Sequence, residues 1–346
     1  MPRILLLHTG GTLGMAGGRP SALRPAAFFK TLKSRCPELF QLADIELELF
    51  CNLDSSEMQP ELWSQLASHL HRRLPDFDGA VVTHGTDTLA YTASALSFML
   101  PGLPKPVVLT GSQRPLGEIR SDARLNLIDA VLSALQGPPE VSICFDSHLY
   151  RGNRTRKVKV SEYDAFESPN CPLLGTLGVD ATFAPGLRQK GPFRLREKLE
   201  SRVFLLKVFP GLDPALPLAL LPHVRGLVME AYGAGNFPLT REHRSLLPLF
   251  AEARERDVPV VVVSQAHRNG VDLSLYESGA AALAEGALSG GDMTPSAALV
   301  KLMQALAYHP DREARARFIE TPIVGEMTDL PRSVQPPPVK KSKRAR

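Results

Sequence analysis

Residues 80–100, AVVTHGTDTLAYTASALSFML, have the pattern of a strand that turns through a glycine into a helix. Ala80–Thr83 is a short apolar run, as in a strand buried on both faces, and Thr88–Leu100 has helical periodicity. Gly85 permits a sharp turn between the two elements. The same alternation recurs along the chain, so the sequence predicts an α/β fold built on a parallel sheet with right-handed crossovers.

Working outward from this unit, we predict seven further strands and four further helices. Most of the strands are continuous apolar runs, whereas Ile45–Cys51 alternates and suits an edge strand. The strands are Ile4–Leu7, Ile45–Cys51, Val107–Thr110, Val141–Phe145, Val203–Val208, Gly226–Met229 and Val258–Val263. The helices are Glu61–Arg73, Ala123–Gln136, Glu242–Arg256 and Pro295–Tyr308.

The chain of 346 residues is long enough for two domains. Residues 184–201 are rich in Gly, Pro, Arg and Lys and lack periodicity, which is typical of a linker. We therefore predict a larger N-terminal parallel-sheet domain at 1–185 and a linker at 186–201. A smaller C-terminal α/β domain follows at 202–330, and a proline run opens a disordered basic tail at 331–346.

The charge distribution argues against nucleic acid as a partner. The net charge is +4, but five cations lie in the last seven positions, so the rest of the chain carries −1. That body lacks the clustered basic surface of a duplex-binding protein. The tail is open to contact with an anionic surface, and we favour a solvated, disordered end.

The cysteines and the apolar runs predict a cytoplasmic location. Four scattered cysteines without a C-x-x-C pair fit reduced thiols better than a disulfide framework. The first apolar run is too short for a signal peptide, and no run approaches the length of a membrane span. We expect no membrane association.

Three stretches contain residues suited to chemistry. Thr9–Gly14 follows the first strand, where adjacent glycines let a backbone approach a ligand and expose the Thr12 hydroxyl. A simple glycine turn remains an alternative, and a phosphate loop fits poorly because Thr12 stands where that motif needs glycine.

The second stretch, Thr83–Thr88, leads into a helix N-terminus, which favours anions such as a substrate carboxylate. Helix capping explains one of its hydroxyl or carboxylate residues, but not two threonines and Asp87 around one turn.

In the third stretch, Arg151–Lys157, spacing alone favours a solvated cationic face over a buried catalytic lysine. Clustered Cys and His ligands are absent, and His69 and His71 point to different helical faces. The two histidines are therefore typical of a surface and not of a metal site.

Taken together, these stretches resemble the asparaginase family, in particular its bacterial type I branch. Thr9–Thr12 resembles the first family motif, and His84–Leu96 resembles the second over a long stretch. Further matches continue in order to about residue 325: Thr110–Gln113 with Arg120–Asp122, Tyr150–Lys157 with Phe166–Asn170, Ala231–Asn236 and Gly290–Thr294.

The resemblance implies hydrolysis of L-asparagine to L-aspartate and ammonia by an enzyme without cofactor or metal. It also implies a homodimer or homotetramer with sites at subunit boundaries. Thr12 looks like the nucleophile that forms the acyl-enzyme. Thr86, Asp87 and Lys157 look like a second catalytic group, and the substrate-binding residues look like Asp54, Ser55, Ser56 and Gly85.

Two features depart from the family pattern. Residues 15–25 contain no tyrosine, although family members commonly carry one in this mobile segment. Glu230 and Ala266 stand where a regulatory asparagine site would have an arginine and a cysteine, so we do not predict allostery.

Three other functions stay open. Glutaminase activity differs by one methylene, which is worth only about 1–3 kcal/mol of discrimination. An amidotransferase component that releases ammonia for a partner enzyme would need an additional partner-binding region. A non-catalytic binder is disfavoured because Thr12, Thr86, Asp87 and Lys157 are all present.

Overall fold

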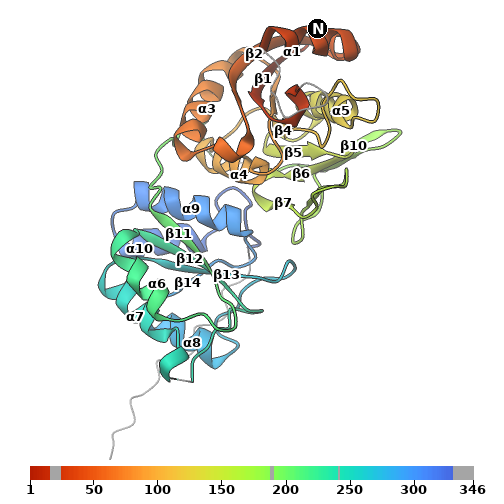
Figure 1. Ribbon diagram of the computed structural model, residues 1–346. Coiled ribbons are helices and arrows are strands. Elements are labelled where there is room, and N and C mark those ends of the chain that lie inside the picture. The colour runs from red at the N-terminus through yellow and green to blue at the C-terminus, as the bar shows by residue number, and fades with distance from the viewer. Residues whose placement is uncertain (16–24, 188–190, 241, 330–346) are drawn as a thin grey trace, which may run out of the picture.

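The structure, a computed structural model, describes residues 1–15, 25–187, 191–240 and 242–329. They form two α/β domains, each built around its own sheet (Figure 1). The predicted basic tail and most of the segment that lacks a tyrosine lie outside the described residues.

The N-terminal domain has an eight-stranded sheet in the order β10-β9-β6-β5-β4-β3-β1-β2. The run from β5 to β2 is parallel, and β6, β9 and β10 extend it with antiparallel pairs. The strands are β1 (Arg3–Gly10), β2 (Asp44–Leu53), β3 (Gly79–Thr83), β4 (Val107–Thr110), β5 (Val141–Phe145), β6 (His148–Arg151), β9 (Gly175–Leu177) and β10 (Ala181–Phe183). A separate hairpin pairs β7 (Arg156–Lys157) with β8 (Phe166–Glu167).

Helices cover both faces of this sheet because alternate residues of its strands point to opposite sides. Leu5 and Leu7 of β1 pack with one helical layer, and Ile4 and Leu6 pack with the other. The first layer is α3 (Pro60–Arg73) and α4 (Leu89–Met99). The second is α1 (Pro25–Arg35), α2 (Leu39–Leu42) and α5 (Ala123–Gln136).

The C-terminal domain is smaller and has a four-stranded parallel sheet in the order β11-β12-β13-β14. Its strands are β11 (Val203–Lys207), β12 (Gly226–Ala231), β13 (Val260–Ser264) and β14 (Leu288–Ser289). Its helices are α6 (Ala215–Leu220), α7 (Leu247–Glu255), α8 (Glu277–Ala284), α9 (Pro295–Tyr308) and α10 (Arg312–Glu320).

The two domains meet through α9, which packs against α4 of the N-terminal domain (Figure 1). Val300 and Met303 of α9 belong to the same buried apolar cluster as the first helical layer. Between the domains, the Glu200 amide donates to the Met303 carbonyl at 3.0 Å. The domain and linker boundaries remain predictions, but the domains share apolar core.

Two differences from the predicted elements have a clear local cause. The antiparallel strand β6 was not predicted, because the turn before it carries no glycine. Asp146 and Ser147 supply that turn with φ values of 48° and 58°, a pair typical of a tight hairpin. The helix predicted at Glu242–Arg256 begins only at Leu247, because Pro248 cannot continue a helix from Glu242.

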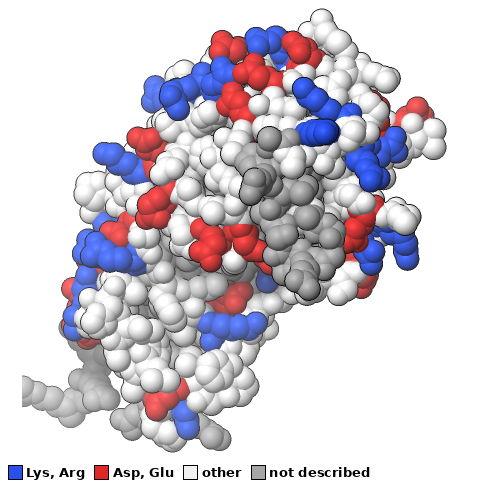
Figure 2. Space-filling view, turned by 45° about the horizontal axis from the view of Figure 1, so that its top comes forward, with Lys and Arg blue, Asp and Glu red and all other residues white. Residues whose placement is uncertain are grey.

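Charged side chains of both signs are interspersed on the face shown in Figure 2. This mixture is what a chain body near neutrality predicts. Among the described residues, no helix is long and apolar enough to cross a membrane.

Candidate active site

The candidate residues gather where four parallel strands end. In the sheet, His8 of β1 lies beside Thr83 of β3, and Thr83 lies beside Thr110 of β4. On the other side, Gly10 of β1 pairs with Leu53 of β2. The turns that follow these strands therefore meet at one edge of the sheet, the usual ligand side of an open α/β fold.

Glycines allow close contact between the turns that follow β1, β2 and β3. Gly10 and Gly11 have φ values of 111° and 81°, which favour glycine over other residues. A Cβ atom on Gly11 would lie 2.5 Å from the Gly85 nitrogen, and one on Gly85 would lie 2.7 Å from the Ser55 Oγ atom. The Thr12 turn, the Gly85 turn and the Ser55 segment thus pack closely together, with the Thr12 side chain partly exposed.

Lys157, at the end of the stretch Arg151–Lys157, contacts two residues of the stretch Thr83–Thr88. Its Nζ atom donates to the Thr86 Oγ1 atom at 2.7 Å and to the Asp87 Oδ1 atom at 2.6 Å. Thr86 is buried and the Lys157 side chain is 17% exposed, whereas the Asp87 side chain is 70% exposed. A hydroxyl, an ammonium and a carboxylate are therefore in direct contact at the rim of the site.

Helix capping does not account for these residues. Thr88 is the N-cap residue of α4, but its side chain makes no capping hydrogen bond. The Thr88 hydroxyl donates instead to the Ser55 carbonyl at 2.6 Å. This bond ties the start of α4 to the segment after β2.

A buried chain of hydrogen bonds, which starts on α3 and passes through α4, fixes the Gly85 turn. The Trp63 Nε1 atom donates to the Thr92 Oγ1 atom at 3.0 Å, so the Thr92 hydroxyl is left to donate to the His84 Nε2 atom, also at 3.0 Å. The His84 Nδ1 atom then carries the proton and donates to the Gly85 carbonyl at 2.7 Å. Burial lowers the pKa of His84 to about 4, so the ring is neutral.

Asp54 and Ser56 form a compact turn beside the site. The Ser56 amide and hydroxyl donate to the Asp54 Oδ1 atom at 2.9 and 2.8 Å. These bonds lower the pKa of Asp54, because they stabilise the charged carboxylate. Ser55 is buried between Asp54 and Gly85, whereas Asp54 and Ser56 are exposed.

The expectation of a solvated cationic face at Arg151–Lys157 was wrong. Arg151 forms a two-pronged ion pair with Glu140, and Arg154 is buried against Asp292. Sequence spacing misses this arrangement because both carboxylates come from other elements.

A cavity of about 240 Å³ opens beside the Lys157–Asp87 pair. Tyr91 and Ser296 line this cavity but were not among the predicted site residues, although Tyr91 lies within the second motif. Burial and the nearby Glu230 carboxylate raise the pKa of Tyr91, so its hydroxyl keeps its proton. Among the described residues, no cluster of His, Cys, Asp and Glu is arranged to hold a metal ion.

Comparison with known proteins gives the family. The family model described as "Asparaginase, N-terminal" matches residues 3–186, and "Glutaminase/Asparaginase C-terminal domain" matches residues 202–318. The chain belongs to the asparaginase family. The resemblance, the fold class and the amidohydrolase class are therefore confirmed.

Individual asparaginase-family relatives match along nearly the whole chain. L-asparaginase 1 of Escherichia coli (strain K12) is 35% identical over 333 residues, covering 94% of this chain and 98% of its own length. The solved structure of the thermostable L-asparaginase from Thermococcus kodakarensis has a TM-score of 0.88 and 37% identity, and the match covers 95% of this chain and 100% of that one. A glutamyl-tRNA(Gln) amidotransferase component of Methanothermobacter thermautotrophicus is 34% identical, covering 95% of this chain and 78% of its own length.

Proposed function

We propose that this protein hydrolyses L-asparagine to L-aspartate and ammonia through an acyl-enzyme on Thr12. The observation that carries the proposal is the contact of Lys157 with both Thr86 and Asp87, beside the glycine turn that presents Thr12. A threonine hydroxyl is a weak nucleophile near neutral pH and needs a proton acceptor within reach. The Thr86–Lys157–Asp87 group supplies such a unit.

The reaction proceeds in two steps. The Thr12 oxygen attacks the side-chain amide carbon, the C–N bond breaks, and the nitrogen leaves as ammonia after gaining the hydroxyl proton. A water molecule then attacks the ester, and aspartate leaves as Thr12 regains its proton. In the first step the Thr86 oxygen, which Lys157 contacts, takes the proton from Thr12 while the Thr86 hydrogen passes to the leaving nitrogen, so Thr86 ends the step unchanged.

Substrate recognition uses the segment after β2. The ionised Asp54 carboxylate pairs with the α-amino group, and Ser55, Ser56 and the Gly85 turn take the α-carboxylate. Opposite charges at the two ends of a small zwitterion fix its orientation. We further propose a cytoplasmic homodimer or homotetramer without cofactor, in keeping with four free cysteines and with the type I resemblance.

Glutamine hydrolysis is the second candidate, because the matching C-terminal family is described as "Glutaminase/Asparaginase C-terminal domain". Parallel assays of ammonia release from L-asparagine and L-glutamine decide between the two. Faster turnover of asparagine supports the proposal, and faster turnover of glutamine replaces it with the second candidate. Release from neither by folded protein contradicts both and favours a binding protein.

Hydroxylamine tests the acyl-enzyme. An acyl-enzyme on Thr12 predicts that added hydroxylamine diverts product from aspartate to aspartyl hydroxamate, because both nucleophiles compete for the same ester. Hydroxylamine that inhibits turnover without yielding hydroxamate contradicts the two-step route.

A further inference from the structure

Lys157 lies on a short hairpin whose two strands have two residues each. The hairpin β7–β8 pairs Arg156 with Glu167 and Lys157 with Phe166, and the Val158 and Lys159 amides donate to the Ala165 carbonyl at 2.8 and 3.3 Å. It forms a sheet of its own, separate from the eight-stranded sheet that carries the Thr12 and Thr86 turns. Ala165 and Phe166 of one side of the hairpin are buried in the N-terminal core, whereas Lys157, on the other strand, also depends on the chain that leads into the hairpin from Arg154.

Arg154, three residues before Lys157, ties one end of the hairpin to the C-terminal domain. Its side chain is 5% exposed, and its Nη1 and Nη2 atoms donate to the two carboxylate oxygens of Asp292, each at 2.9 Å. The same guanidinium donates to the Glu326 carbonyl at 2.9 Å and to the Thr328 Oγ1 atom at 3.0 Å. All three partners of Arg154 named here come after residue 290 in the chain.

Asn170 ties the other end to the same region. Its carbonyl accepts from the Arg154 Nη2 atom at 2.8 Å, and its Nδ2 atom donates to the Asn269 carbonyl at 2.9 Å. The Asn269 amide donates back to the Asn170 Oδ1 atom at 2.8 Å. Both ends of the segment that carries Lys157 are therefore anchored to the C-terminal domain.

Asp292 also has further hydrogen-bond partners that fix its carboxylate. The Thr328 amide and hydroxyl donate to its carboxylate at 2.8 and 2.6 Å. Although burial acts in the opposite direction, the bonds from Arg154 and Thr328 lower the pKa of Asp292, so it remains ionised. A planar guanidinium facing a fixed carboxylate with two parallel bonds sets orientation as well as distance.

We propose that Arg154 and Asp292 are positioning residues, whose interdomain ion pair fixes the hairpin so that Lys157 contacts Thr86 and Asp87. The inference rests on the proposed function of Lys157. Neither residue touches the reacting atoms; the pair acts through the chain between Arg154 and Lys157. A displacement of about 1 Å at a reacting group can cost about a hundredfold in rate, so loosening this anchor lowers kcat.

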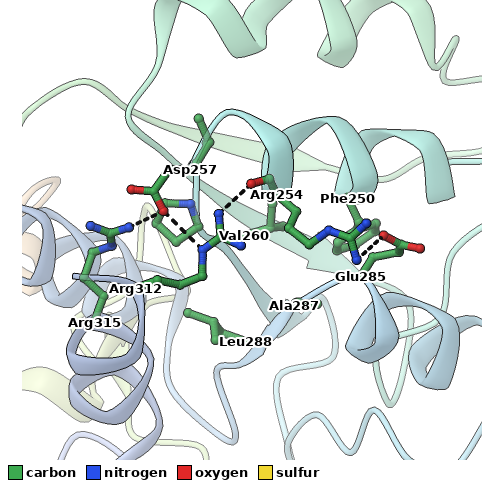
Figure 3. A pocket seen from close by; sticks show the side chains of 12 residues that line it. Phe250, Arg254, Asp257, Val260, Glu285, Ala287, Leu288, Arg312 and Arg315 are labelled. Atoms are coloured by element: carbon green, nitrogen blue, oxygen red, sulfur yellow. Dashed lines mark hydrogen bonds and ion pairs between the residues drawn. The ribbon is translucent and has the colours of Figure 1, made fainter. Parts of the chain in front are cut away.

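Asp292→Asn tests the proposal, with Asp257→Asn as the matched control. In both variants a buried arginine loses its charged partner, because Asp257 pairs with Arg315, whose side chain is 6% exposed, and with Arg312 (Figure 3). Asp257 lies just before β13, and Arg312 and Arg315 lie on α10, so the control ion pairs stay within the C-terminal domain. We expect Asp292→Asn to lower kcat for asparagine at least about tenfold with a KM change of no more than about twofold. The control keeps both constants within about twofold.

A chemical readout separates this proposal from the proposed function. Amine acylation of the folded protein, followed by peptide mapping, reports the accessibility of Lys157 relative to the neighbouring Lys159. We expect Asp292→Asn to raise the relative rate at Lys157 and Asp257→Asn to leave it unchanged. If wild-type protein lacks amidase activity, the proposed function fails, but the labelling still tests the anchor.

Thr328→Val is the milder variant if Asp292→Asn does not fold, because it removes one side-chain hydrogen bond to each partner. It should change kcat and labelling in the same direction by a smaller factor. The proposal is overturned if an anchor variant folds yet keeps wild-type kcat and Lys157 labelling, or if the control loses as much kcat.

Discussion

At the scale of single residues, Lys157 is the group whose removal we expect to affect turnover most specifically. Replacing it with methionine keeps much of the apolar stem but removes the ammonium that contacts Thr86 and Asp87. A positioned proton-transfer group contributes about a hundredfold to ten-thousandfold in rate. We therefore predict that Lys157→Met lowers kcat by at least about a hundredfold, measured as ammonia release from saturating asparagine.

The control is Lys159→Met, two residues along the chain. Lys159 forms its ion pairs with Glu162 and Asp164 near the surface, away from the Thr86 hydroxyl. The Lys159→Met variant should retain most of the wild-type kcat. Equal losses in the two variants would mean that the site depends on the general charge of the hairpin and not on Lys157.

Two buried histidines predict a pH dependence of stability. Burial lowers the pKa of His8 and of His84 from an ordinary 6.5 to about 4. Between these values the unfolded chain binds protons that the folded chain does not, so stability is lost as the pH falls from 6.5 toward 4. Each histidine should contribute a slope of about 1 kcal/mol per pH unit in that window.

Urea unfolding at a series of pH values measures this slope. The double variant His8→Gln/His84→Gln should show a flatter dependence than wild type, whereas His223→Gln, at an exposed position, should keep the wild-type slope. An unchanged slope in the double variant would show that other groups cause the acid sensitivity.

Sequence and resemblance together pointed to most of the residues that meet at the site. Thr12, Asp54 and the Gly85 turn each follow a predicted strand, whereas Lys157 was indicated by the resemblance alone. Arg154 could not be found in this way. Its carboxylate partner, Asp292, is 138 positions away, and a run of cations taken alone is typical of a solvated surface. Burial of that kind depends on how the domains pack, which no local pattern records.

At the scale of elements, α3 and α4 are locked to the Gly85 turn by the chain Trp63–Thr92–His84. Thr92→Val keeps the shape of the side chain but leaves the Trp63 donor and the His84 acceptor without that partner. An unsatisfied buried polar group costs about 1–3 kcal/mol. We predict a loss of that size in the free energy of unfolding, measured by denaturant titration.

Thr176→Val provides the comparison, because Thr176 is exposed and pairs with Thr182 across β9 and β10. Its unfolding free energy should change by less than about 0.5 kcal/mol. A Thr92→Val variant as stable as Thr176→Val would show that the buried chain of hydrogen bonds contributes little.

Elements with strong periodicity were predicted to the residue, as β4, β5, α5 and α9 show. Those that depend on tertiary contacts were not. The two-residue strands β7 and β8 have no pattern of their own, and α10 buries only part of one face beside α9. Short or weakly amphipathic segments take their structure from the surfaces that they pack against.

At the scale of the whole molecule, the two domains should unfold together. Val300 and Met303 of α9 complete the apolar cluster around α4, and the Arg154–Asp292 pair bridges the domains a second time. Separating the domains would expose that apolar surface and a buried charge. Differential scanning calorimetry should therefore show one cooperative transition, whereas two resolved transitions would show that the shared core contributes little to domain coupling.

The sharpest test of a threonine nucleophile compares ammonia release from asparagine by wild-type protein and by Thr12→Ala. The threonine is partly exposed on its turn, so its replacement by alanine should leave the fold intact, as far-ultraviolet circular dichroism can verify. We predict turnover by wild type and a loss of at least about a thousandfold in kcat for the variant, since the covalent route is removed. A folded Thr12→Ala protein that releases ammonia at the wild-type rate would contradict this mechanism, because another group would then have to be the nucleophile.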